Sequence, residues 1–160
     1  MTRLAITGHR GLPAETEKLV DKALRAEVDR HAQGGALVGL SCLADGADAM
    51  FARAVLDADG ELVAIIPAAG YRDGLPAEHH QTYDELYSRA VDTIALGYKD
   101  STSESHMAAS ERMLDEADHV LAVWDGQPAR GYGGTADVVH AARERGVPVT
   151  VVWPHGSRRE

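Results

Sequence analysis

The sequence predicts an α/β fold in which helices cover both faces of an open parallel sheet. Two observations support this prediction. Short apolar runs alternate along the 160 residues with longer segments whose apolar side chains recur at helical spacing, and this alternation is typical of parallel strand–helix–strand units. Glycine, proline and acidic residues stand at the junctions between them. We expect strands at 4–6, 36–41, 62–66 and 93–96, in an apolar run that begins at 118, and at 147–152.

The first strand leads into the loop Thr7-Gly8-His9-Arg10-Gly11, and a helix should follow it. Pro13 stands where the first helical residue is favoured, and Gly34-Gly35 ends the pattern. The apolar side of this helix consists of Leu19, Val20, Ala23, Leu24 and Val28. Arg10 is suited to hold a phosphate or carboxylate and His9 to hydrogen-bond a ligand, although both are equally compatible with a solvated turn.

The second strand ends at Ser41, and the turn that follows it runs through Asp48 into a helix. Asp48 is interpreted as an acid that stabilises the helix dipole. After the third strand, residues 68–80 break the rhythm and suggest a lid. In that segment Tyr71 and Arg72 are either ligand contacts or plain surface.

The fourth strand is preceded by a helix at 81–90 and followed by a hydroxyl-rich segment at 98–105. Ser101 and Glu104 have the spacing of a capping box, which predicts a helix from His106 to about Ala117. The same hydroxyls are also suited to bind a sugar or phosphate.

The most informative stretch follows the fifth strand. Its apolar run ends in Asp125-Gly126, and glycines then lead through Gly133-Gly134-Thr135 into a helix. Such a turn leaves backbone N–H groups and the positive end of a helix dipole available to an anion, most often a phosphate. A tight connection with Thr135 as its N-cap is the simpler alternative. We favour ligand binding because a plain turn rarely needs so many glycines.

Topology should bring the loops together at one edge of the sheet. We expect the strand order 3-2-1-4-5-6, in which the winding reverses beside strands one and four. Loops 8–11, 99–105 and 125–135 would then converge on one site at the carboxyl ends of the strands.

Composition limits the range of functions. A chain of this length with 44% hydrophobic residues suggests one domain over residues 1–160. No apolar run of about 18 residues and no signal peptide are seen, and the single Cys42 agrees with a cytoplasmic location. The formal net charge of −9 argues against broad nucleic-acid binding. The sequence indicates neither a metal nor a cofactor, and it leaves homo-oligomerisation open.

The chain resembles the SLOG superfamily of Rossmann-like nucleotide-binding domains, which includes DprA and the LOG enzymes. Four ordered matches carry the resemblance: the loop at 7–10, the turn at 41–48, the run 112–118, and the pair 125–126 with 133–135. The resemblance implies a small phosphorylated or nucleotide-like ligand. It also implies a set of ligand-binding residues, namely Gly8, His9, Arg10, Ser41, Arg112, Asp125, Gly126, Gly133, Gly134 and Thr135. Cys42 and Asp45 depart from the glycine and arginine that are common in this family.

Two classes of function remain open. LOG-type phosphoribohydrolases carry a catalytic acid where this chain has Val138, so the resemblance implies binding more strongly than hydrolysis. We therefore expect a sensor or carrier domain. The alternative is an enzyme that cleaves or transfers an N-glycosidic bond, with Asp137 or Glu111 as the carboxylate. A similarity to nucleoside 2-deoxyribosyltransferases places Asp137 where those enzymes have their nucleophile, although an acid here also stabilises a helix N-terminus.

Overall fold

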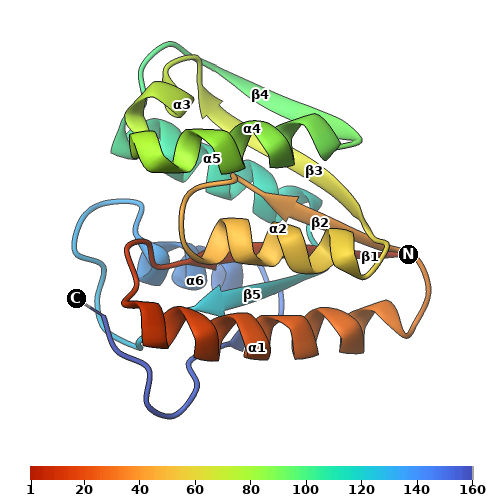
Figure 1. Ribbon diagram of the computed structural model, residues 1–160. Coiled ribbons are helices and arrows are strands. Elements are labelled where there is room, and N and C mark those ends of the chain that lie inside the picture. The colour runs from red at the N-terminus through yellow and green to blue at the C-terminus, as the bar shows by residue number, and fades with distance from the viewer. Residues whose placement is uncertain (160) are drawn as a thin grey trace.

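The computed structural model describes residues 1–159, which form a six-stranded parallel sheet between two layers of helices (Figure 1). The predicted fold class is confirmed. The strands are β1 (Thr2–Gly8), β2 (Leu37–Ser41), β3 (Glu61–Ala68), β4 (Asp92–Tyr98), β5 (His119–Val123) and β6 (Val149–Val151). All neighbouring pairs are parallel, as expected where helical crossovers join consecutive strands.

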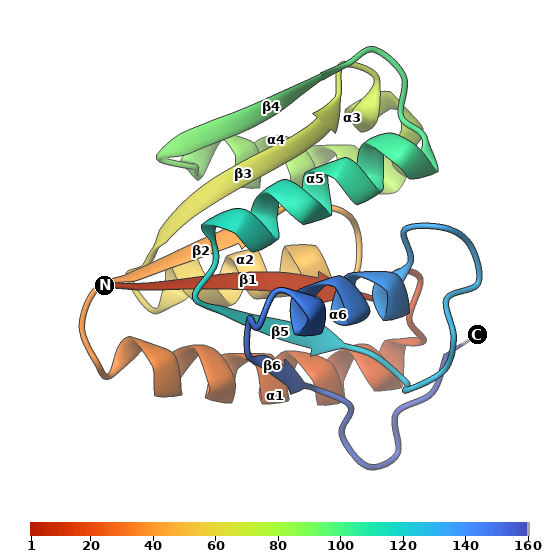
Figure 2. The same cartoon turned by 180° about the vertical axis from the view of Figure 1, so that it is seen from behind.

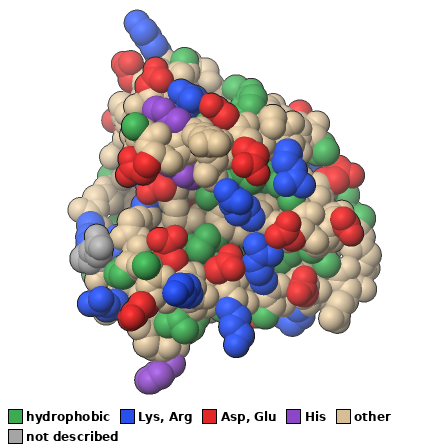
Figure 3. Space-filling model, in the orientation of Figure 1, with side chains coloured by type: hydrophobic (Ala, Val, Ile, Leu, Met, Phe, Trp, Pro, Cys, Tyr) green, Lys and Arg blue, Asp and Glu red, His purple; other side chains and the backbone are tan. Residues whose placement is uncertain are grey.

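Helices connect the strands and cover both faces. They are α1 (Ala14–Ala32), α2 (Ala47–Asp57), α3 (Tyr71–Gly74), the short 3-10 helix η1 (Ala77–His79), α4 (His80–Arg89), α5 (Ser103–Glu116) and α6 (Thr135–Glu144). Helices α1, α2 and α4 lie in front of the sheet in Figure 1, and α5 and α6 cover the opposite face in Figure 2. Positive and negative side chains are interspersed on the face with α1, α2 and α4 (Figure 3).

The observed strand order is 4-3-2-1-5-6, so the predicted order was wrong for the fourth strand. Strand β4 pairs with β3 at the outer edge, and β5 takes the place beside β1. Burial explains the choice. The run Val120–Val123 is fully buried, as a central strand requires, whereas β4 is half-buried or exposed along its length. The winding therefore reverses one strand later than expected, between β1 and β5.

The core forms two layers that the sheet separates. The first lies between the sheet and α1, α2 and α4, and it includes Leu4, Ile6, Val20, Leu24, Phe51, Leu62 and Leu86. The second lies beneath α5 and α6 and includes Leu40, Ile65, Met113, Leu114, Val120 and Val138. Leu19, which was expected on the buried side of α1, is 37% exposed. The two layers hold the sheet rigidly, so the carboxyl ends of its strands form a fixed platform.

Two local predictions are corrected. The capping box of α5 uses Thr102 and Ser105, whose side chains bond each other's backbone N–H groups at 3.1 and 2.9 Å. It does not use Ser101 and Glu104. The segment suggested as a lid folds into α3 and η1, and its Tyr71 is only 4% exposed. The aromatic ring of Tyr71 has enough apolar surface to pack into the core.

Candidate functional site

A pocket of about 340 Å³ lies at the carboxyl ends of the central strands. Its wall is built by the loops after β1 and β2, by the end of β3, by α5, and by the glycine-rich loop that leads from β5 into α6. Figure 2 shows the arrowheads of β1 and β5 directed towards this last loop. The site therefore lies where the winding of the sheet reverses, which is the general location of ligands in such folds.

Six of the sequence-predicted ligand residues line this pocket, and they come from two loops more than a hundred residues apart. They are Gly8, His9, Arg10, Gly133, Gly134 and Thr135. Gly8 allows the start of α2 to pack closely against the end of β1, because a Cβ at Gly8 would stand 2.5 Å from the Cβ of Ala47. The backbone N–H of His9 also donates to the carbonyl of Val123 at 3.1 Å, which ties the first loop to β5.

His9 links the two loops through its ring. Burial is the main cause that lowers the pKa of His9, and it outweighs the opposing effect of Asp125. Nε2 lies 3.0 Å from the backbone N–H of Asp125 and 3.2 Å from its carboxylate. Because the neutral ring is favoured, Nε2 accepts from that N–H and Nδ1 carries the proton. Nδ1 then donates to Oγ1 of Thr135 at 3.2 Å, so the Thr135 hydroxyl hydrogen remains able to serve a ligand.

The glycine-rich loop presents the N-terminus of α6 to the pocket. Gly134 is the N-cap, and no side chain caps this helix. Gly133 has φ +83°, a conformation that L-residues rarely adopt. Its N–H donates to Oδ2 of Asp137 at 2.9 Å. Asp137 therefore fixes the shape of the loop and does not line the pocket.

Three arginines give the pocket wall positive charge: Arg10, Arg130 and Arg159. Arg10 pairs with Asp45 at 2.8 Å, and Arg159 stands 3.8 Å from Asp125. Arg130 and Arg159 repel each other, which contributes to the lowered pKa of Arg159 after burial. Such an excess of guanidinium groups around a small pocket favours an anion.

Asp48 is the functional candidate that sequence reasoning missed. It was interpreted as a dipole partner, yet it lines the pocket. Part of its side chain remains accessible from the pocket, but the protein surrounds it closely enough that desolvation raises the pKa of Asp48 to about 7. The position of Asp48 in the sequence could have indicated this, because an acid in the first helical turn after a parallel strand lies at the edge of the sheet where ligands bind.

Three predicted ligand residues stand close to pocket-lining residues in the sequence but do not line the pocket themselves: Ser41, Asp125 and Gly126. Ser41 is fully buried, and its hydroxyl accepts from the N–H of Leu43 and donates to the carbonyl of Asp48. Asp125 contacts His9 and accepts from the N–H of Gln127 at 3.0 Å. Hydrogen bonds with other loop residues thus occupy the side chains of Ser41 and Asp125.

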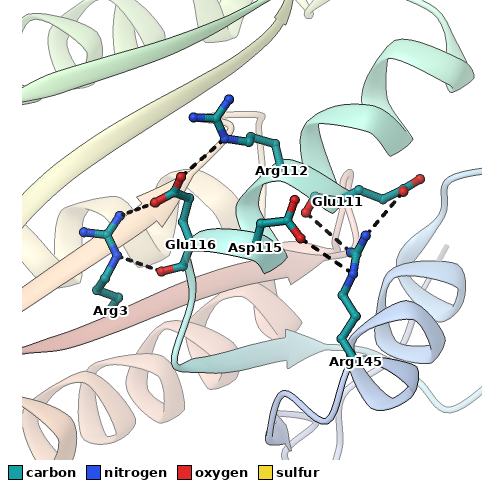
Figure 4. Close-up of polar contacts among 6 residues, drawn as sticks. All are labelled: Arg3, Glu111, Arg112, Asp115, Glu116 and Arg145. Atoms are coloured by element: carbon teal, nitrogen blue, oxygen red, sulfur yellow. Dashed lines mark hydrogen bonds and ion pairs between the residues drawn. The ribbon is translucent and has the colours of Figure 1, made fainter.

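Arg112 and Glu111 lie elsewhere, on the outer side of α5 (Figure 4). Arg112 pairs with Glu116 at 3.3 Å, and Glu116 also pairs with Arg3. Glu111 pairs with Arg145 at 3.4 Å. These ion pairs connect α5 to β1 and to the end of α6. The sequence did not reveal that the inward side of α5 presents His106, Ser110 and Met113 to the pocket instead.

The hydroxyl-rich segment before α5 stands beside the pocket and does not form its wall. It follows the edge strand β4, so the corrected strand order displaces it from the reversal point. Its Ser101 hydroxyl bonds Nε2 of His106 at 2.7 Å and thereby positions that ring at the pocket. Burial lowers the pKa of His106, which favours its neutral form.

Two further findings concern residues 1–159. They contain no group of three or more histidine, cysteine, aspartate or glutamate side chains with a metal-binding arrangement. None of their helices combines the length and the apolar character needed to cross a bilayer.

No protein-family model matches the chain, and no curated protein sequence matches it. Solved structures do resemble it. DprA from Streptococcus pneumoniae is 19% identical with a TM-score of 0.67, and the match covers 94% of this chain and 50% of that one. DprA from Helicobacter pylori is 17% identical with a TM-score of 0.68, and the match covers 94% and 64%. The chain therefore spans about half to two thirds of these DprA chains.

A third similar structure is the molybdenum cofactor binding protein of Rippkaea orientalis. It is 14% identical with a TM-score of 0.60, and the match covers 94% of this chain and 75% of that one. At these identities the likeness concerns the fold. The chain shares the Rossmann-like fold of DprA and of the molybdenum cofactor binding protein.

Proposed function

We propose that this protein binds a nucleotide or nucleotide-derived small anion in the pocket at the ends of β1 and β5, as a carrier or sensor domain. The observation that carries the proposal is the joint presence of an uncapped helix N-terminus and three arginines on one pocket wall. The chain as a whole carries a formal charge of −9. A cationic pocket on an acidic protein is a local arrangement, and a bound phosphate accounts for it.

The dimensions and composition of the pocket support a nucleotide rather than a bare phosphate. A volume of about 340 Å³ exceeds what an inorganic anion fills. Apolar and aromatic groups, including Ile6, Tyr71 and Met113, share the wall with the polar ones. A ligand with an anionic end and a flat, less polar end matches both parts.

Binding is better supported than glycosidic cleavage by the predicted carboxylates. Neither Asp137 nor Glu111 lines the pocket, and each already has a partner, the N–H of Gly133 and the guanidinium of Arg145. A nucleophile must reach the anomeric carbon of a bound sugar. N-glycosidic hydrolysis or transfer therefore remains the alternative with less support.

Calorimetric titration with AMP, GMP, the matching nucleosides and ribose 5-phosphate tests the proposal. We expect the monophosphates and ribose 5-phosphate to bind, and the nucleosides to bind much more weakly. Equal affinity for nucleosides and nucleotides would overturn the phosphate assignment. Release of free base during the titration, measured by chromatography, would instead support the enzyme.

A short single-stranded DNA belongs in the same experiment. The structure of Helicobacter pylori DprA is described in terms of single-stranded DNA binding, so this fold does not support excluding nucleic acid. The acidic charge of our chain leads us to expect weaker binding of the oligonucleotide than of a mononucleotide. Tighter binding of the strand would mean that the pocket receives one nucleotide of a polymer.

A further inference from the structure

The pocket has two chemically different ends. The sheet order places the loops after β5 and β1 side by side, followed by the loop after β2 and then the end of β3. The glycine-rich loop and Arg130 stand at the β5 end, whereas Asp48 and Tyr71 come from the β2 and β3 side. A phosphate held by the first end therefore directs the rest of its ligand towards Asp48.

The Asp48 carboxylate has hydrogen-bonding capacity to spare. Among residues 1–159, the one hydrogen bond to this carboxylate comes from the N–H of Ala44, which lies 3.4 Å from Oδ2. Four ionisable groups act on it or face it: Arg10 from the loop after β1, Cys42 and Asp45 from its own loop, and Tyr71 from α3. Of these, Arg10 carries the positive charge, and it is paired with Asp45.

The loop that carries Asp48 is held firmly in place. Leu43 is fully buried with φ +60°, a strained conformation for a leucine. Nε2 of the buried His79 donates to the Leu43 carbonyl at 2.9 Å, and the Ser41 hydroxyl bonds the backbone on both sides of the turn. Strain that surrounding contacts maintain is typical of a binding site. The carboxylate is thus presented to the pocket by a preorganised support.

A carboxylate that offers two acceptor oxygens can discriminate among nucleotide bases by the hydrogen-bond donors that they present. Guanine presents two adjacent donors on one edge, a ring N–H and an amino group, and these match both oxygens. Hypoxanthine keeps only the ring N–H. In adenine, the amino donor lies beside a ring nitrogen that is an acceptor on either edge, and this nitrogen would face one carboxylate oxygen and repel it. Pterins share the donor pair of guanine.

We propose that Asp48 is the specificity-determining residue of this pocket, and that it accepts hydrogen bonds from a cyclic amide N–H and its neighbouring amino group, as in guanine and pterins. This inference rests on the proposed function, because the phosphate end must first be bound. It adds the chemical class of the base or ring system at the end of the ligand that lies away from the phosphate.

Titrating GMP, IMP, AMP and ribose 5-phosphate into the wild-type protein and into Asp48→Asn tests the inference. In the wild type we expect GMP to bind more tightly than IMP and IMP more tightly than AMP, with about ten- to a hundredfold between GMP and AMP. Asparagine replaces one acceptor by a donor, so GMP should lose that advantage while ribose 5-phosphate keeps its affinity. A phosphorylated pterin is titrated alongside, and whichever of it and GMP binds more tightly identifies the source of the shared edge.

Asp45→Asn is the matched control in the same loop. It removes a carboxylate that pairs with Arg10 and contributes to the raised pKa of Asp48. At a pH well above 7, where Asp48 is ionised in both proteins, it should therefore raise affinity for all the phosphates alike and leave the ratio of GMP to AMP unchanged. The ratio of GMP to ribose 5-phosphate affinity should also increase with pH through about 7, because Asp48 ionises there in the free protein.

The outcomes separate the two proposals. Binding of ribose 5-phosphate and of all three nucleotides with equal affinity would overturn the role of Asp48 and leave the phosphate site standing. Failure of every phosphate to bind would overturn both. If Asp48→Asn does not fold, the wild-type order of GMP, IMP and AMP still decides, since a preference for AMP contradicts a carboxylate acceptor.

Discussion

Replacing Arg10 by alanine tests whether the loop after β1 holds the phosphate. The guanidinium uses Nε and one terminal nitrogen for Asp45, at 2.9 and 2.8 Å. Arginine carries five N–H groups, so donors remain for a ligand without breaking this pair. A hydrogen bond between charged groups contributes roughly 1.5–3 kcal/mol. Arg10→Ala should therefore weaken binding of nucleoside monophosphates by about ten- to a hundredfold.

The nucleosides should lose far less, because they lack the anion. Folding should also change little, since Arg10 and Asp45 are 45% and 22% exposed and such a pair contributes about 0–1 kcal/mol to stability. Calorimetry gives the two affinities, and thermal melting gives the stability. Increasing the salt concentration should reduce the difference between wild type and variant, because ions screen a half-exposed charge.

Arg25→Ala is the matched control. Arg25 is likewise a partly exposed arginine paired with aspartates, in its case Asp21 and Asp57, and it is 38% exposed, but it lies on α1 and does not line the pocket. This variant should bind every ligand as the wild type does. Equal losses for nucleotides and nucleosides in Arg10→Ala, or a comparable loss in Arg25→Ala, would refute the phosphate role of Arg10.

Three further variants test other parts of the site. Gly133→Ala should lose about 1–2 kcal/mol of stability in chemical denaturation, because residue 133 has a positive φ, and it should also weaken nucleotide binding. Gly146→Ala is its control: Gly146 has φ +73° and open space around it, so this variant should lose stability and keep its nucleotide affinity. Asp137→Asn keeps an acceptor for the Gly133 N–H, so we expect a cost of at most about 1 kcal/mol and equal or tighter nucleotide binding by calorimetry; loss of a measured glycosidic turnover would contradict this. Burial lowers the pKa of His9, so the unfolded chain takes up a proton at this residue more readily than the folded chain does. The stability of the wild type should therefore fall as pH drops below about 6.5. In His9→Gln this fall should be smaller, as urea titrations between about pH 5 and 8 would show. An unchanged pH slope in that variant would contradict the neutral, buried ring.

The sequence by itself determined the fold class and half of the site. Apolar runs with helical periodicity between them leave few arrangements other than a covered parallel sheet. Loops at the carboxyl ends of parallel strands must lie at one edge of that sheet, and glycines that lead into a helix leave backbone N–H groups there that can bind an anion. Gly8 to Arg10 and Gly133 to Thr135 could be assigned to the pocket on this basis, although whether they bind a ligand stays a prediction.

Tertiary structure decided the strand order and the remaining wall. Local periodicity is the same for a central and an edge strand, so only packing showed that β4 lies outside β3 and that β5 adjoins β1. The orientation of α5 was likewise decided by packing, because Met113 and Leu114 enter the core and leave the ion pairs of Arg112 and Glu111 on the outer side. Asp48 looked like a helix-dipole partner because burial depends on residues distant in sequence. Only the folded chain surrounds it closely enough to raise the pKa of its carboxyl to about 7 and expose it to the pocket.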